Sequence, residues 1–238
     1  MQHQCEEHTR LQSEGMATSA LPKIPIFLKL THSFLLPKDL RAPLIMIGPG
    51  TGVAPFIAML QHRRKQLQEA PPWAMMSPLV DRMSDPQASP LLSVCSRDDM
   101  SITSNESQEG KSIGETHLFF GCRHRKSDWL FSEAIEEFVE DGTLTSLHLA
   151  LSQEGEEGRW YGGCYVQDKM MESSIRICHL LLSCKAHIYV CGDAQSMARD
   201  VRRILLDVLE EVEGLGSDEA HAVMDHLVSL GRYHEDIY

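Results

Sequence analysis

The sequence predicts a three-layer α/β domain built on a parallel β-sheet. Short apolar runs of strand length alternate along the chain with longer segments whose apolar residues recur at helical spacing. This alternation is typical of βαβ units, in which helices cover both faces of a parallel sheet. A glycine-rich turn between the first apolar run and the first helical segment supports the same fold class, because such turns often join a parallel strand to its helix.

Four apolar runs are predicted to form the strands of this sheet. They are largely continuous rather than alternating, which indicates that both faces of the sheet are covered. In chain order they are LIMI (44–47), HLFFG (117–121), LHLAL (147–151) and HIYVCG (187–192).

Four further segments have the pattern of amphipathic helices. One of them is predicted to start at Ser217 as its N-cap, with Asp218 and Glu219 in the first turn, and to continue to Leu230. The apolar stripes of the other three are Val53, Phe56, Ile57 and Leu60; Leu130, Ala134, Ile135 and Phe138; and Met197, Val201, Ile204, Leu205 and Val208.

Two polar segments lie outside this pattern, and we expect both to be disordered. Residues 1–20 are aperiodic, and residues 69–115 hold a proline-rich stretch followed by Ser, Asn, Glu and Gly. Neither contains a pattern that buries enough surface to offset the entropy of ordering. The predicted organisation is a disordered N-terminus and one folded domain, 21–238, that the insertion interrupts.

Composition disfavours several classes of function. The formal charge of −12 makes binding to nucleic acid or to anionic membranes unfavourable. No apolar run approaches the roughly 18 residues needed to span a bilayer, and the N-terminal segment has no apolar core of the kind found in secretory signals. We therefore expect a soluble, cytoplasmic protein.

Cysteine and histidine spacing argues against a metal centre. The seven cysteines include no CxxC pair, which disfavours both a disulfide scaffold and a zinc ribbon and favours a reducing compartment. His3, Cys5 and His8 are close in sequence, but no second ligand pair has zinc spacing. We expect no bound metal.

The turn formed by Gly48, Pro49, Gly50, Thr51 and Gly52 predicts an anion site. Backbone N–H groups of such a turn and of the following helix, together with a hydroxyl, favour phosphate. No lysine follows the last glycine, so the turn is not a Walker A loop, and its spacing also differs from GxGxxG. A turn whose glycines serve packing alone is the alternative.

Five segments follow one another along the chain in an order typical of one family. They are GPGTGVAPF (48–56), FFGCRHRKSDWLF (119–131), YVQD (165–168), IYVCGDAQSMARDV (188–201) and RYHEDIY (232–238). Together they resemble the NADPH-binding domain of the diflavin reductases, within the ferredoxin–NADP reductase group. The resemblance implies a Rossmann-like domain of a flavoprotein oxidoreductase, in which NADPH reduces FAD and electrons pass through FMN to a redox partner.

The resemblance also implies site residues. Cys191 and Asp236 would lie near the nicotinamide and serve as the catalytic pair. Without the resemblance, the first is a buried strand-end cysteine and the second a solvated acid. The implied cofactor-binding residues are Gly48, Pro49, Gly50, Thr51, Gly52, Arg123, Ser152, Gln153, Tyr165, Val166, Gln167, Asp200 and Tyr238.

Within that set, the parts of the cofactor are divided among several segments. The glycine turn would hold the pyrophosphate, with Arg123 beside it. Ser152, Tyr165 and Gln167 would face the adenosine 2′-phosphate. Tyr238 would stack on the flavin, in a position where the family usually has tryptophan followed by serine.

Two positions depart from the family pattern where it binds the 2′-phosphate. Gln153 replaces an arginine and Cys164 replaces a lysine. Charge-assisted hydrogen bonds of this kind are worth about 1.5–3 kcal/mol each. We expect weaker NADPH binding and poorer discrimination against NADH, unless Arg159 substitutes for the missing cations.

The motifs of an FMN domain and of an FAD domain are absent from the sequence. A hydride-donor site without a flavin has no acceptor, so we expect this chain alone not to turn over. A C-terminal fragment, a truncated isoform and an alternative gene model are all compatible with the sequence. The alternative function is a catalytically silent nucleotide-binding module that acts through partner contacts.

Overall fold

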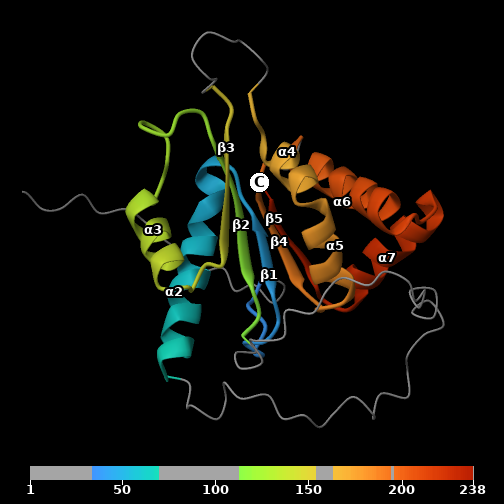
Figure 1. Ribbon diagram of the computed structural model, residues 1–238, viewed down its shortest axis with the longest axis horizontal. Coiled ribbons are helices and arrows are strands. Elements are labelled where there is room, and N and C mark those ends of the chain that lie inside the picture. Colours follow the sequence, from blue (N-terminus) through green and yellow to red (C-terminus); the bar gives the residue numbers. More distant parts are fainter. Residues whose placement is uncertain (1–33, 70–112, 154–162, 194–195, 238) are drawn as a thin grey trace, which may run out of the picture. The chain divides into compact units, whose positions relative to one another are not determined.

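The computed structural model describes residues 34–69, 113–153, 163–193 and 196–237 (Figure 1). Within these residues a five-stranded sheet has the order β3-β2-β1-β4-β5, and every neighbouring pair is parallel. The predicted α/β class with a parallel sheet is confirmed. The strands are β1 (Leu44–Ile47), β2 (Thr116–Cys122), β3 (Ser146–Leu151), β4 (His187–Gly192) and β5 (Tyr233–Ile237).

The central strand β1 explains why the fold needs helices on both faces. All of its residues are fully buried, and their side chains alternate between two apolar clusters. Ile45 and Ile47 belong to one cluster, and Leu44 and Met46 belong to the other. A strand of this kind is stable only when both faces of its sheet are covered.

Helices cover the two faces of the sheet unequally. Residues of α2 and α3 form the cluster with Leu44 and Met46, whereas residues of α4, α5, α6 and α7 form the cluster with Ile45 and Ile47. Figure 1 shows the two helix layers on either side of the strands. The helical elements are η1 (Gly50–Val53), α2 (Ala54–Glu69), α3 (Ser132–Glu140), α4 (Val166–Glu172), α5 (Ser174–Leu182), α6 (Met197–Glu213) and α7 (Ser217–Ser229).

Several local predictions need correction. The helix after the glycine turn begins as a 3₁₀ turn at Gly50, before the α-helix starts at Ala54. Leu130 lies outside α3 and is 40% exposed, so it is not part of that helix's buried stripe. Ser217 is the first residue of α7 rather than its N-cap, which is Gly216. The short helices α4 and α5 and the strand β5 were not predicted as elements.

The predicted disordered segments fall almost entirely outside the described residues. This holds for residues 1–20 and for residues 70–112 of the predicted insertion. The ends of the insertion are described: Glu69 is the last residue of α2, and residues 113–115 lead into β2. The predicted domain limits remain a prediction.

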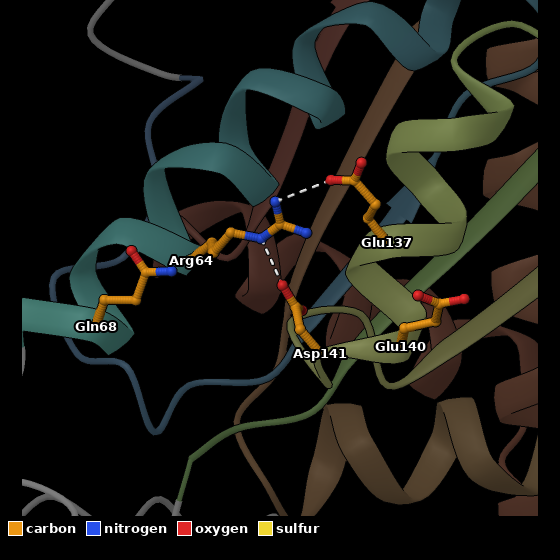
Figure 2. Close-up of a pocket in the computed structure, with 5 residues that line it drawn as sticks. All are labelled: Arg64, Gln68, Glu137, Glu140 and Asp141. Carbon is orange, nitrogen blue, oxygen red and sulfur yellow. Dashed lines mark hydrogen bonds and ion pairs between the residues drawn. The ribbon is translucent and has the colours of Figure 1, made fainter.

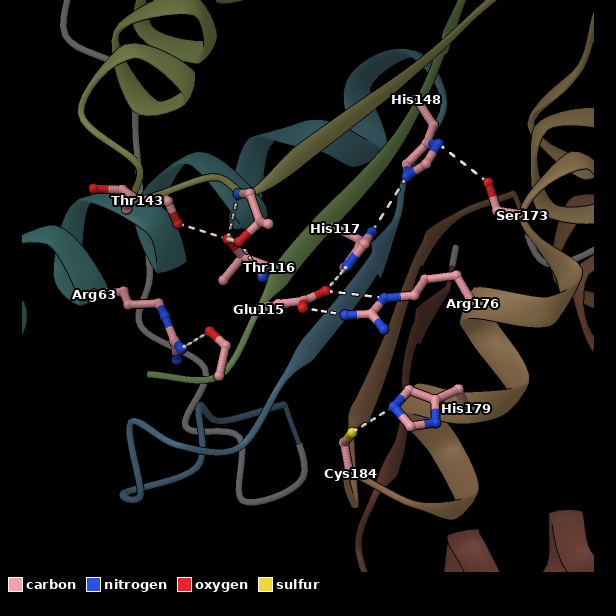
Figure 3. Close-up of polar contacts among 12 residues, drawn as sticks. Arg63, Glu115, Thr116, His117, Thr143, His148, Ser173, Arg176, His179 and Cys184 are labelled. Carbon is pink, nitrogen blue, oxygen red and sulfur yellow. Dashed lines mark hydrogen bonds and ion pairs between the residues drawn. The ribbon is translucent and has the colours of Figure 1, made fainter. Parts of the chain in front are cut away.

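A chain of polar side chains crosses the face of β2 and β3 that α4 and α5 cover (Figure 3). His117 lies between Glu115, at 3.0 Å from its Nε2, and His148, at 3.3 Å from its Nδ1. The other ring nitrogen of His148 lies 3.3 Å from the Ser173 hydroxyl. Arg176 forms an ion pair with Glu115, so the negative charge of the Glu115 carboxylate is neutralised.

Burial keeps His117 and His148 uncharged at neutral pH. It is the main cause that lowers the pKa of His148 to about 4, and His117 and Lys169 make smaller contributions in the same direction. The His148 ring stacks on Phe119 with a centroid separation of 4.1 Å. A neutral imidazole therefore packs here much as an aromatic side chain would.

Protonation of His148 should make the folded state sensitive to acid. The unfolded chain takes up this proton near pH 6.5 and the folded chain near pH 4, so stability should rise with pH between these values. His148→Phe keeps a ring on Phe119 and should reduce that rise by about 1–2 kcal/mol, after allowance for solvent screening. Urea denaturation at pH 4.5 and pH 7 measures the difference.

The test is the difference between the two pH values, so a general loss of stability in the variant does not affect it. His187, whose pKa burial also lowers to about 4, should account for a rise that remains in the variant. His226→Gln, at an exposed position on α7, should behave as the parent chain does. An equal rise in His148→Phe and in the parent would contradict this assignment.

Candidate functional site

The predicted site residues meet at one edge of the sheet. Because all strands are parallel, their carboxyl ends lie at the same edge. The glycine turn follows the central strand β1, residues 123 and 152–153 follow β2 and β3, and residues 191 and 236 lie at the ends of β4 and β5. The fold therefore brings together segments that are far apart in sequence.

The glycine turn is held against the end of β4. Gly48 donates its N–H to the Phe119 carbonyl at 3.0 Å, and Gly52 donates to the Pro49 carbonyl at 3.1 Å. A Cβ at Gly52 would overlap the carbonyl oxygen of Cys191, so only glycine fits there. Gly50 has a φ of +57°, and a Cβ there would meet no atom within 4 Å. One side of the turn is therefore packed and the other is open to a ligand.

Cys191 and Asp236 are register partners on β4 and β5. Cys191 is 3% exposed, whereas the Asp236 carboxylate is exposed to solvent. Burial raises the pKa of the Cys191 thiol to about 11, and the charge of Asp236 adds to the effect. The thiol is therefore protonated at neutral pH and is suited to a neutral contact, not to nucleophilic attack.

On the other side of the glycine turn, the ends of β2 and β3 bring three predicted residues together. Ser152 donates its N–H to the Cys122 carbonyl at 2.9 Å, and Gln153 donates to the Arg123 carbonyl at 3.0 Å. These bonds continue the β2–β3 pairing beyond the last strand residues. The Arg123 and Gln153 side chains are exposed at this edge.

The start of α4 joins the same group. Cys164 donates its N–H to the Leu151 carbonyl at 3.2 Å, which connects the segment to the end of β3. Tyr165 is the N-cap of α4 and is 58% exposed, and its N–H is bound by the Asp168 carboxylate at 2.7 Å. Val166 is buried and Gln167 is half-buried, so Tyr165 is the most exposed of the three predicted residues in this turn.

Two glycines at this edge were missed by sequence reasoning. A Cβ at Gly121 would lie 3.1 Å from Val166 and 3.2 Å from Pro49, so the missing side chain leaves room between the glycine turn and α4. Gly192 follows Cys191 with a φ of +145°, a conformation that other residues rarely adopt. Their signal was a glycine at the end of an apolar run.

Three predicted residues are not part of this group as described. Asp200 lies in the first turn of α6, where it is half-buried and 3.7 Å from Arg203. Its predicted role in cofactor binding stays a prediction. Tyr238 and the substitute cation Arg159 lie outside the described residues.

The strand order places the glycine turn at a topological switch point. The chain passes from β1 outward through β2 to β3, and then returns to β4 on the other side of β1. Ligands of open α/β sheets bind in the crevice at such a point. Of the described residues, Cys191 and Asp236 lie on one side of this point, and Arg123, Ser152 and Tyr165 lie on the other.

A hollow of about 420 Å³ lies between α2 and α3 (Figure 2). It is lined by Arg64, Gln68, Glu137, Glu140 and Asp141. Arg64 lies between the carboxylates of Glu137 and Asp141, so its charge is already neutralised. The hollow is distant from the glycine turn, and it contains no group that suits a dinucleotide.

The described residues contain neither a metal cluster nor a membrane-spanning helix. No group of three or more His, Cys, Asp or Glu side chains in them has the arrangement of a metal site. None of the helices in the described ranges is both long enough and apolar enough to cross a membrane.

Comparison with known proteins agrees with this geometry. Residues 46–203 match the model of a family described as oxidoreductase NAD-binding domain. Methionine synthase reductase of Rattus norvegicus is 34% identical over 98% of this chain and 28% of that protein, and its Homo sapiens counterpart is 34% identical over 97% and 28%. NADPH–cytochrome P450 reductase of Cavia porcellus is 33% identical over 90% and 25%. The chain spans only about a quarter of the length of these relatives.

The contact between the glycine turn and β4 should be essential for folding. Gly52→Ala places a methyl group on the Cys191 carbonyl and should cost about 3 kcal/mol or more of unfolding free energy. Gly216→Ala is the control, because Gly216 has a φ of −70° and its Cβ would lie 3.7 Å from the nearest atom. It should cost about 1 kcal/mol or less. Chemical denaturation of both variants measures the difference, and equal losses would rule out the close approach.

Proposed function

The chain belongs to the oxidoreductase NAD-binding domain family, and we propose that it is the NADPH-binding, hydride-donating lobe of a flavin-dependent reductase similar to methionine synthase reductase. The proposal rests on one observation above all. Cys191 and Asp236 are register partners at the ends of β4 and β5, next to a glycine turn that is packed against the Cys191 carbonyl. A phosphate on the turn would thus have a neutral thiol and a carboxylate on one side of it.

Different residues of the site would bind different parts of the cofactor. The open side of the glycine turn would hold the pyrophosphate, with the exposed Arg123 beside it. Ser152, Tyr165 and Gln167 would receive the adenosine end. These are the roles that the family resemblance implies, and the position of the residues at the carboxyl edge of the sheet supports the proposal.

The nicotinamide, when bound, supplies a hydride to a flavin ring. Loss of the hydride leaves a positive charge on the ring, and the Asp236 carboxylate would stabilise that charge. The protonated thiol of Cys191 would pack against the ring without adding a competing negative charge. Tyr238 would stack on the flavin in the family's arrangement.

The acceptor and the cellular setting follow the same resemblance. FAD and FMN would be held by domains of the diflavin type, in the same protein or in a partner, and the final acceptor would be methionine synthase. No disulfide joins any two of the five cysteines among the described residues, which is consistent with the reducing environment of the cytoplasm. Nucleic acid and membranes are not proposed as partners, given the charge of −12.

A specific observation supports a second candidate function. Gln153 and Cys164 carry no charge at the positions where the resemblance implies cations. A module that keeps the fold and a weak affinity for nucleotides, but donates no hydride, is compatible with these substitutions. Binding measurements separate the two candidates.

The first prediction concerns cofactor preference. Calorimetric titration of the chain at one fixed, low salt concentration should show micromolar binding of NADP⁺, with at least about a tenfold preference over NAD⁺. Weak and equal binding of the two nucleotides would favour the silent module. Absence of binding by either would contradict both candidates.

The second prediction concerns hydride transfer. With a separately expressed FAD-binding domain of a diflavin reductase, NADPH oxidation should fall about tenfold or more in Cys191→Ala and in Asp236→Asn. The affinity for NADP⁺ should change less than threefold in both. Cys184→Ala is the matched control, because that thiol lies in the turn before β4, away from the carboxyl edge. Unchanged rates in both site variants would show that the pair has no role in the transfer.

A further inference from the structure

The proposed function leaves one part of the cofactor without a clear partner. A 2′-phosphate is recognised by cations, and neither Gln153 nor Cys164 supplies one. The structure shows a cation near the second of these positions. Lys169 lies on α4, one helical turn beyond Tyr165.

The helix directs Lys169 towards the site. Its N–H lies 3.3 Å from the Tyr165 carbonyl, so the two residues are i and i+4 neighbours on one side of α4. The Cα–Cβ bonds of a helix tilt towards its N-terminus, which for α4 is the end at the carboxyl edge of the sheet. The flexible stem of a lysine can therefore bring its ammonium group to the groups that Tyr165 contacts.

The charge of Lys169 already acts on position 164. Burial raises the pKa of the Cys164 thiol, and the positive charge of Lys169 opposes that rise. In turn, the hydrogen bond that Lys169 donates to the Glu172 carboxylate raises the pKa of Lys169. The ammonium group therefore stays charged and acts at the position where the family has a lysine, where the carboxylates of Asp168 and Glu172 act with the opposite sign.

Lys169 is held by an exchangeable partner. Its Nζ lies 2.7 Å from the Glu172 carboxylate, and the two side chains are 28% and 60% exposed. Exposed ion pairs of this kind contribute little to stability, so a phosphate that carries more charge competes well for the lysine. Glu172 would then act as a resting partner for the ammonium group when no cofactor is bound.

We propose that Lys169 is the cation that binds the 2′-phosphate in this chain, and that it leaves Glu172 to do so. The assignment deepens the proposed function and rests on it, because it needs NADPH to bind at this edge. It makes Lys169 a specificity-determining residue: it should affect the phosphorylated cofactor and leave the unphosphorylated one unaffected.

The experiment is a set of calorimetric titrations of the full chain and its variants with NADP⁺ and with NAD⁺. Lys169→Gln should weaken NADP⁺ binding about tenfold or more and leave NAD⁺ binding within about twofold. Glu172→Gln should strengthen NADP⁺ binding about two- to fivefold, because the lysine no longer has a competing partner. Thermal unfolding of each variant checks that the fold is intact.

The matched control is Lys65→Gln. Lys65 also forms a helical ion pair, with Glu69 at 3.7 Å, but it lies towards the far end of α2. It should leave the affinities for both nucleotides unchanged. If Lys65→Gln and Lys169→Gln weakened NADP⁺ binding equally, the loss would come from the change in net charge. That result would overturn the assignment.

The remaining outcomes separate the two proposals. If the parent chain prefers NADP⁺ and Lys169→Gln keeps that preference, the lysine assignment is wrong and the proposed function stands. If the parent chain binds both nucleotides equally, the lysine assignment fails and only nucleotide binding is retained. If it binds neither, both proposals fail.

Discussion

The structure depends on the close packing of a glycine turn against the end of a neighbouring strand. At Gly52 the backbone lies so near the Cys191 carbonyl that no side chain fits between them. This contact joins the turn after β1 to the end of β4, which are far apart in sequence and adjacent in the sheet. It sets the distance from the open side of the turn to Cys191, and so from a bound phosphate to the thiol. A change at Gly52 would therefore disturb the sheet and the site together.

The elements that could be predicted from the sequence are those whose burial gives them a clear apolar pattern. The run LIMI is covered on both faces, and it was predicted as a strand because parallel strands are continuously apolar. The strand YHEDI lies at the edge of the sheet, and Tyr233 is its only buried residue. Its other residues are mostly polar, so it has no apolar run that would predict a strand. Backbone pairing with β4 makes this segment a strand, although its sequence has no apolar pattern. The short helices α4 and α5 meet at Ser173. Neither is long enough to give the extended apolar stripe from which a helix is predicted.

The resemblance named the members of the candidate site, whose roles stay predictions, and the structure adds their arrangement. It implied that Cys191 and Asp236 both lie near the nicotinamide, and the β4–β5 register shows that they are direct neighbours. Gly121 carried only the weak signal of a glycine at the end of an apolar run, because its importance comes from Pro49 and Val166, which approach it from two other segments. Lys169 was invisible for a related reason. A lysine three residues before a glutamate on a helix has the pattern of an ordinary surface ion pair.

The strong negative charge of the chain and its proposed anionic cofactor are compatible because they act over different distances. At physiological ionic strength, charges separated by more than ~8 Å are largely screened from one another. A long polyanion lies across much of the surface and meets the net charge of −12, whereas a dinucleotide meets only the groups of one sheet edge. At that edge the basic segment Arg123–Lys126 follows β2, and Lys169 lies one helical turn beyond the start of α4. The overall charge thus bears on which polymers the chain repels, and under the proposed function a few local cations would determine which small anion it accepts.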